Sequence, residues 1–186
     1  FGAVYSGISE ETGKTCAIKV FKPSSRAQKS YDEEVESFQK VKGLENVAQM
    51  VDHFKSDIGF VVVVDYYNLG DLMNVLFNLN DQTAARIKGG TSSKEYMYSD
   101  RVLCDTIHIL IDTEVGLQSM HEKLISHTDL KPENVLVRGP RNTIEGKAED
   151  LKEPSKLTAA MGDLGLVEEA NAAKAAAESE RAALLE

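Results

Sequence analysis

Apolar runs separated by turn residues predict several short strands in the first third of the chain. Residues 15–21 are apolar and rich in β-forming types apart from one lysine, and residues 11–14 before them supply a hairpin turn. Residues 59–67 contain four consecutive valines between turn signals, which is typical of a central strand buried on both faces. A shorter apolar run at residues 50–54 precedes a polar turn. These runs predict a strand-rich first third.

Apolar residues recur at helical spacing in other stretches. Residues 31–41 place apolar side chains on one side and four acids in the first turns, where the positive end of the helix dipole favours negative charge. Residues 72–79 and 99–121 are also helical in pattern, and the longer stretch is apolar enough for a core helix. Residues 168–186 are rich in Ala, Glu, Lys and Leu, which predicts a solvated terminal helix. The intervening polar stretches predict loops or inserts, at residues 80–98 and 138–156.

Composition narrows the classes of function. The chain has 186 residues, of which 42% are hydrophobic and 27% charged, as in a soluble globular protein. Its net charge of -9 argues against a nucleic-acid surface, which needs concentrated Lys and Arg. Cys16 and Cys104 lie far apart without metal-ligand spacing and suit a reducing cytoplasmic or nuclear compartment. No apolar run approaches the roughly 20 residues that cross a bilayer. We therefore expect neither nucleic acid nor membrane as a partner.

The most informative stretch is a polar loop at residues 127–134, which reads His-Thr-Asp-Leu-Lys-Pro-Glu-Asn and leads into an apolar strand. It resembles the catalytic loop of eukaryotic protein kinases, and the lysine after Asp-Leu resembles the serine/threonine-specific branch. The resemblance implies that Asp129 accepts the proton of the attacking hydroxyl, that Lys131 steadies the γ-phosphate and that Asn134 binds a metal ion. It also implies that His127 packs in the core and does not react.

Two further motifs support this resemblance. An Ala-Ile-Lys triplet inside a predicted strand ends at Lys19, which implies that this lysine grips the α- and β-phosphates. Such a lysine needs a carboxylate partner, and counting along the family pattern selects Glu34, with Glu33 and Glu36 as alternatives. Asp163 begins an Asp-Leu-Gly triplet that resembles the Asp-Phe-Gly of the family, which implies that its carboxylate chelates Mg²⁺.

The resemblance also outlines a nucleotide pocket. Gly2 is expected to be the last glycine of a phosphate loop whose first part is absent, and Val4 and Ala17 are expected to cover the adenine. The end of the valine-rich strand, Asp65 to Tyr67, is expected to form the hinge between two lobes, where backbone groups meet the edge of the adenine. By that register Val64 guards the back pocket and Asp71 meets the ribose. The full set of expected nucleotide contacts is Gly2, Val4, Ala17, Lys19, Val64, Asp65, Tyr67, Asp71 and Leu136.

On this resemblance we expect an α+β, protein-kinase-like fold of two lobes, truncated at both ends. The N-lobe is expected to be a five-stranded-type antiparallel sheet that lacks its first strand, together with helix C, and the C-lobe to be helical and incomplete. The expected division is residues 1–67 for the N-lobe with the hinge, 68–167 for the partial C-lobe with the catalytic loop and the Asp-Leu-Gly motif, and 168–186 for the Ala/Glu-rich helical tail.

The function expected from the resemblance is ATP- and Mg²⁺-dependent transfer of phosphate to a serine or threonine hydroxyl of a protein substrate. A nucleotide-binding pseudokinase-like module, or an inactive kinase remnant, is the alternative, because the glycine loop and lower C-lobe are incomplete. A small-molecule kinase of the aminoglycoside or choline type shares the two-lobed plan, but Lys131 argues against it. We expect little activity from this piece alone, and an exposed apolar surface on the helix at residues 99–121 that promotes association.

Overall fold

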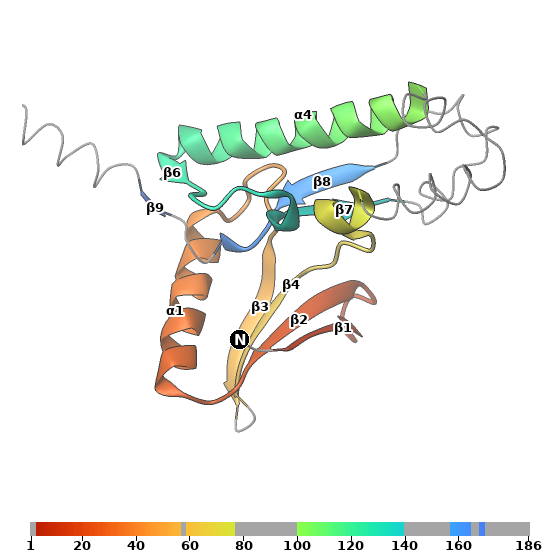
Figure 1. Cartoon of the computed structure of the whole chain (residues 1–186). Helices are drawn as coiled ribbons and strands as arrows, with labels where there is room; N and C mark the ends of the chain where they lie inside the picture. Colours follow the sequence, from red (N-terminus) through yellow and green to blue (C-terminus); the bar gives the residue numbers. More distant parts are fainter. Residues whose placement is uncertain (1–2, 57–58, 77–99, 140–156, 165–167, 170–186) are drawn as a thin grey trace, which may run out of the picture.

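The computed structural model describes residues 3–56, 59–76, 100–139, 157–164 and 168–169. The first part of the chain forms a four-stranded antiparallel sheet with the strand order β1-β2-β4-β3 (Figure 1). Its strands are β1 (Ala3–Ile8), β2 (Thr15–Phe21), β3 (Met50–Ser56) and β4 (Gly59–Asp65). This sheet agrees with the predicted N-lobe sheet of five strands less the first.

A tight turn joins β1 to β2. Between β1 and β2, Gly13 adopts a φ of +67°, and its amide donates to the Ser9 carbonyl at 2.8 Å. This left-handed backbone suits glycine, because a side chain with a Cβ is strained there. The Ser9 amide in turn donates to the Lys14 carbonyl at 2.9 Å and closes the turn. The predicted hairpin turn before the second strand is therefore confirmed.

The valine-rich strand β4 lies inside the sheet, between β2 and β3. Val61 and Val62 are 2% and 0% exposed and point to opposite faces, as predicted for a strand buried on both sides. Val63 and Val64 are only half-buried, so that prediction is wrong for the second half of the strand. Val64 lies opposite Ala17, whose small side chain covers little of its surface.

One helix, α1 (Ser25–Lys40), packs against a face of this sheet (Figure 1). It begins at Ser25 rather than at residue 31, because the Ser24 hydroxyl accepts a hydrogen bond from the Ala27 amide at 3.0 Å and caps the first turn. The acids expected in its first turn lie in the middle of the helix, so the helix dipole does not explain them. The buried side of the helix consists of Tyr31, Glu34, Val35, Ser37 and Phe38.

The second part of the chain contains a three-stranded antiparallel sheet with the order β5-β7-β8. Its strands are β5 (Gly70–Asp71), β7 (Val135–Arg138) and β8 (Thr158–Met161). The long helix α4 (Asp100–Glu122) lies against β8 and agrees closely with the helix predicted at residues 99–121 (Figure 1). A short 3₁₀ helix, η1 (Pro132–Asn134), precedes β7. Residues 72–76, the described part of the helix predicted at 72–79, are helical.

A two-residue ladder contradicts the prediction of a helix that begins at residue 168. Strand β9 (Glu168–Glu169) pairs antiparallel with β6 (Ile125–Ser126). An extended backbone gains interstrand hydrogen bonds there, and this tertiary pairing overrides the good helix propensity of glutamate. The rest of the predicted tail, the predicted loop at 80–98 and nearly all of the predicted insert at 138–156 lie outside the described residues.

A large apolar cluster joins the two parts of the chain. It combines side chains of α1, β2 and β4 with side chains of α4, β6 and β8. Its buried members are Phe21, Tyr31, Val35, Phe38, Val41, Val47, Val62, Met120, Ile125, Met161 and Leu164. Gly116 lets α4 approach the chain before β3 closely, because a Cβ there would lie 2.6 Å from the Asn46 carbonyl oxygen. The sheet of the first part and the helix of the second therefore share one core.

The helix α4 also carries apolar side chains on an exposed surface. Ile107, Leu110 and Ile111 are 43%, 59% and 51% exposed. This is the uncovered apolar surface expected from the sequence, while the association expected from it stays a prediction. Within the described ranges, no helix is both long enough and apolar enough to span a membrane.

Candidate active site

Lys19 on β2 forms a short ion pair with Glu34 of α1. Lys19 Nζ lies 2.6 Å from Glu34 Oε2, and the two side chains are 27% and 8% exposed. Burial raises the pKa of Glu34, and the neighbouring Lys19 ammonium opposes that rise without cancelling it. The carboxylate is therefore almost fully removed from water, whereas the lysine nitrogen remains partly open to a ligand.

The structure also shows why this carboxylate, and neither of its neighbours, meets the strand lysine. Glu33 and Glu36 lie on the outer side of α1 and are 52% and 65% exposed. Each is near a lysine one turn away along the helix, Glu33 at 3.6 Å from Lys29 and Glu36 at 3.0 Å from Lys40. Glu34 alone among the three faces the sheet, because helical residues only one or two positions apart point in different directions.

Three of the expected nucleotide contacts share a sheet face with Lys19. Val4 of β1 is directly opposite Lys19. Ala17 lies two residues before Lys19 on β2 and opposite Val64 of β4. Opposed residues and alternate residues point to the same side of a sheet, so these side chains form one surface beside the ion pair. Gly2 lies outside the described residues.

The loop between β6 and β7 gathers three polar side chains. Lys131 Nζ is 2.7 Å from Asp129 Oδ2, and Asn134 Nδ2 donates to the same oxygen at 3.1 Å and to the Asp129 carbonyl at 2.8 Å. The hydrogen bond from Lys131 holds the pKa of Asp129 below its ordinary value and raises the pKa of Lys131. Asp129 is therefore ionised at neutral pH and can only accept hydrogen bonds.

Gly162 connects this loop to Asp163. The Gly162 amide donates to the Asn134 carbonyl at 2.8 Å, and the Gly162 carbonyl accepts from His127 Nε2 at 2.9 Å. A carbonyl oxygen only accepts, so Nε2 is the ring nitrogen of His127 that carries a hydrogen. The side chain of His127 is 3% exposed, which agrees with its predicted packing in the core. A Cβ at position 162 would lie 2.6 Å from Leu136 Cδ1, so a side chain there would push Leu136 aside.

Asp163 lies within electrostatic reach of both parts of the chain. Its φ of +51° is left-handed, a conformation that aspartate adopts more readily than most residues, and its side chain is exposed. Burial mainly raises the pKa of Glu34 and the hydrogen bond to Asp129 mainly raises the pKa of Lys131, and the charge of Asp163 adds to both rises. Leu164, the next residue, is fully buried in the shared core and anchors the segment. The structure therefore brings Asp163 near the ion pair and near the polar loop.

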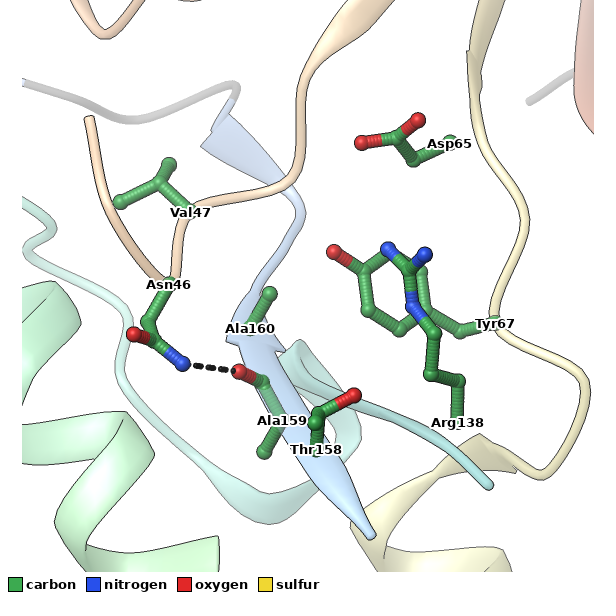
Figure 2. Close-up of a pocket in the computed structure, with 8 residues that line it drawn as sticks. All are labelled: Asn46, Val47, Asp65, Tyr67, Arg138, Thr158, Ala159 and Ala160. Carbon is green, nitrogen blue, oxygen red and sulfur yellow. Dashed lines mark hydrogen bonds between the residues drawn. The ribbon is translucent and has the colours of Figure 1, made fainter. Parts of the chain in front are cut away.

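The end of β4 and the segment after it place two of the expected nucleotide contacts at a different pocket. Figure 2 shows that Asp65 and Tyr67 line this pocket, of about 290 Å³, together with Arg138. The Arg138 guanidinium stacks 4.3 Å from the Tyr67 ring centroid. Asp65 follows Val64 on the strand, so its side chain points to the opposite face of the sheet. This placement leaves the backbone of the segment, rather than these two side chains, as a contact for a nucleotide beside Lys19.

The two remaining expected contacts lie on neighbouring strands of the second sheet. Asp71 Oδ1 accepts from the Asn74 amide at 2.8 Å, and Oδ2 accepts from Asn74 Nδ2 at 2.6 Å. This is the hydrogen bonding of a helix cap, which engages both carboxylate oxygens without a ligand. Leu136 lies opposite Asp71 on β7 and packs beside Tyr67 and Ala160.

Sequence reasoning missed two contributors to this region. Gly162 acts through its backbone and its lack of a side chain, and the only local signal is its place directly before Asp163. Arg138 was assigned to a polar insert, although it is the last residue of β7. Its stacking on Tyr67 joins segments far apart in the sequence, so no local pattern reveals it.

Two features together define the class of protein. The Lys19–Glu34 pair joins the sheet to α1, and a backbone hydrogen bond joins the polar loop to the residue before Asp163. A family model described as the protein kinase domain matches residues 1–180. The chain therefore belongs to the protein kinase family, and the α+β kinase-like fold predicted from the sequence is confirmed.

Several curated relatives are similar to this chain at low identity. Serine/threonine-protein kinase TIO of Arabidopsis thaliana is 27% identical over 144 residues, which cover 74% of this chain and 9% of the relative. MAP kinase-interacting serine/threonine-protein kinase mnk-1 of Caenorhabditis elegans is 24% identical over 153 residues, or 81% of this chain and 19% of the relative. Myosin light chain kinase family member 4 of Homo sapiens is 28% identical over 138 residues, or 73% and 30%. The chain thus spans less than a third of the length of these relatives.

Proposed function

We propose that this kinase domain binds ATP with Mg²⁺ beside the Lys19–Glu34 pair and directs transfer of the γ-phosphate to a serine or threonine hydroxyl of a protein substrate. The observation that carries the proposal is the ion pair itself, with Nζ 2.6 Å from a carboxylate that is 8% exposed. A buried ion pair adds little to stability, because desolvation offsets the attraction. A partly open ammonium held in this way is better explained by an anionic ligand such as a phosphate chain.

The polar groups around Asp163 fit Mg²⁺. This ion prefers hard oxygen ligands, and Asn134 offers an amide oxygen while Asp163 offers an exposed carboxylate. The Gly162–Asn134 backbone hydrogen bond holds these two residues on adjacent segments. The described residues contain no group of three or more His, Cys, Asp or Glu suited to a metal, so we expect phosphate oxygens to complete the coordination. When bound, Mg²⁺ neutralises charge on the phosphate oxygens.

The polar loop supplies the remaining roles in the proposal. Asp129 orients the substrate hydroxyl and accepts its proton, and its lowered pKa keeps the carboxylate ionised at neutral pH. Lys131, which contacts Asp129 at 2.7 Å, turns toward the γ-phosphate when the nucleotide is present. Lys19 would contact the α- and β-phosphates. The protein's own contribution is therefore positioning and charge.

A melting-temperature titration of the 186-residue chain with ATP and Mg²⁺ tests the nucleotide site. The wild type is expected to show a metal-dependent rise, because a ligand that binds the folded state stabilises it by mass action. Lys19→Met and Asp163→Asn are expected to abolish the rise. Lys14→Met, at an exposed turn on the same hairpin, is the matched control and should keep it. A folded wild type that shows no rise, or a rise that survives Lys19→Met, contradicts the proposal.

Phosphate transfer is tested separately, by incorporation of labelled γ-phosphate into a library of serine- and threonine-containing peptides. Asp129→Asn is expected to lower the rate by about 100-fold or more, since it removes the proton acceptor. The same variant should keep the nucleotide-dependent rise in melting temperature. An unchanged transfer rate in Asp129→Asn contradicts the assigned role of this residue.

A further inference from the structure

Helix α1 makes a second set of polar contacts with the sheet, one helical turn before Glu34. The Tyr31 hydroxyl lies 2.8 Å from His53 Nδ1 on β3. Beside it, Asp32 Oδ1 lies 3.2 Å from Lys55 Nζ, on the same strand. The Tyr31 side chain is 3% exposed, whereas the Asp32–Lys55 pair is about half exposed at both ends. Exposed pairs of this kind contribute little, so Tyr31 is the stronger of the two attachments.

The ring of Tyr31 belongs to a row of contacts that leads to the phosphate-binding lysine. It packs against Phe60, with centroids 5.4 Å apart, and meets Phe21 edge-on at 6.3 Å. Lys19 Nζ lies 5.2 Å from the centroid of that same Phe21 ring. Such aromatic and cation–π contacts have preferred geometries, so movement of one ring is felt by its neighbours. A continuous path therefore runs from Tyr31 through Phe21 to Lys19.

The register of the sheet explains why the two polar contacts act together. Lys19 of β2 and His53 of β3 both lie opposite Val62 of β4, so all three side chains point toward α1. On the helix, Tyr31 and Glu34 are three residues apart and lie on the same side. Two residues on one side of the helix, Tyr31 and Glu34, thus contact two residues on one face of the sheet. Two attachments fix the rotation of the helix about its axis, which a single attachment does not.

The protonation state of Tyr31 suits this contact. Burial raises the pKa of its hydroxyl, so the group keeps its proton at neutral pH and can donate it. His53 Nδ1 then accepts, and its other ring nitrogen carries the hydrogen in the neutral imidazole.

We propose that Tyr31 is a positioning residue, whose contact with His53 holds α1 at the rotation where Glu34 reaches Lys19. This inference rests on the proposed function, because Lys19 matters as a phosphate contact. Its immediate consequence concerns the Lys19–Glu34 pair, which exists without nucleotide. It can therefore be tested in the free protein.

The first test measures how fast an acylating reagent, sulfo-NHS acetate, modifies Lys19 in the free chain, read by peptide mass spectrometry. Tyr31→Phe keeps the ring and removes only the hydroxyl. It is expected to speed modification of Lys19 about fivefold, the effect of one lost hydrogen bond, because a lysine nitrogen released from its 2.6 Å contact with the Glu34 carboxylate is more accessible to the reagent. Lys42 and Lys123 report the general reactivity and should not change. An unchanged Lys19 rate overturns the proposal.

Two further variants separate positioning from a general loss of structure. Tyr5→Phe, at an exposed tyrosine on β1, is the matched control and should leave the Lys19 rate unchanged. In a Glu34→Gln background, Tyr31→Phe is expected to have no further effect on that rate, because Tyr31 acts through Glu34. If Tyr31→Phe instead speeds modification of several lysines, in both backgrounds, its role is merely structural and the proposal is wrong.

Nucleotide titration then links the positioning to binding. Tyr31→Phe is expected to raise the dissociation constant for ATP with Mg²⁺ by a similar factor of about five, while Tyr5→Phe leaves it unchanged. If the wild type binds no nucleotide, the proposed function fails, whereas the Lys19 modification rates still decide the role of Tyr31. The two proposals can therefore fail independently.

Discussion

Two lysine–carboxylate pairs of nearly equal length lie in the two parts of the molecule, and their acids respond in opposite ways. Lys19–Glu34 measures 2.6 Å and Lys131–Asp129 measures 2.7 Å. The pKa of Glu34 is raised, chiefly by burial, whereas that of Asp129 is lowered, chiefly by its hydrogen bond to Lys131. Their exposures differ, at 8% for Glu34 and 35% for Asp129. The distance between two charges therefore does not predict the direction of the pKa shift unless their burial is known.

This difference implies two uses for the same chemical contact. The Lys19–Glu34 pair belongs to the packed interface between α1 and the sheet, so its loss affects the fold. The Lys131–Asp129 pair lies in a loop open to water, where either partner can exchange the other for a ligand at little cost.

The largest effect that separates the two pairs is expected from removing each lysine. Lys19→Met leaves Glu34 buried without its partner and is expected to lower the free energy of unfolding by about 2–3 kcal/mol. Lys131→Met is the matched change in the loop and is expected to leave the free energy of unfolding nearly unchanged, because its ion pair is open to water. Urea denaturation of both variants measures the difference. Equal losses would show that burial does not distinguish the pairs.

A somewhat smaller effect is expected from filling the space at Gly162, which tests whether the loop side depends on packing instead of on its ion pair. Gly162→Ala pushes against Leu136 and is expected to cost about 1–2 kcal/mol in urea denaturation. Because Leu136 is the neighbour that clashes, the cost of Gly162→Ala should shrink when Leu136→Ala is already present. The same cost in both backgrounds would point to backbone strain instead.

The pH dependence of stability sharpens the comparison further. The folded state raises the pKa of Glu34 above its ordinary value of 4.5, so it holds that proton more tightly than the unfolded chain does. The contribution of Glu34 to stability is therefore present at low pH and is lost as the pH rises from 4.5 through the raised value. We expect the stability of the wild type relative to Glu34→Gln to fall over that window, measured by urea denaturation at several pH values.

Asp129 should behave in the opposite sense. Its pKa is lowered from 3.8, so any stability that it contributes is present above that value and is lost as the pH falls through the lowered one. Asp129→Asn, compared with the wild type in the same series, is the control. A Glu34 contribution that instead increased with pH would contradict the assignment of burial as the main effect.

The smallest expected change in the free energy of unfolding comes from Leu124, which lies directly before β6 and the polar loop. Leu124 has a φ of +60° and is 44% exposed, a left-handed backbone that disfavours leucine and suits glycine. Leu124→Gly is expected to raise the free energy of unfolding by about 0.5 kcal/mol, since the relief of strain exceeds the added flexibility of the unfolded chain. Leu130→Gly, at an exposed leucine in the same segment, should lower it. Thermal denaturation of the two variants gives the comparison.

Much of the fold was predictable because its signals are local. The valine run of β4 and the apolar spacing of α4 are written in consecutive residues. The start of α1 was missed because residues 25–30 are almost entirely polar, so the apolar periodicity begins only at Tyr31. Its true start depends on the Ser24 cap, which is one hydroxyl. Likewise, β9 forms only because it pairs with β6, a strand far away in sequence. The two glutamates of β9 carry no local signal of that pairing.

The candidate site was predictable where a motif carries it and not where tertiary contacts do. The family pattern selected Glu34, but the sequence alone does not show that Glu34 is buried while Glu33 and Glu36 are exposed. The contact of Tyr31 with His53 depends on the register of β3, which shifts between Met50 and Asp52 at a bulge. A shift of one residue would turn His53 away from the helix. Such a contact follows from the assembled sheet and not from any local pattern.

The shared core has a consequence for any attempt to divide this protein. Met161 and Leu164 are fully buried against side chains of α1 and β4, and Val41 and Val47 are buried against side chains of the second part. A polypeptide cut after the hinge would expose these surfaces on both pieces at once. The two predicted lobes therefore share one buried cluster, and we expect split reporters or separately expressed halves to fold only after they associate.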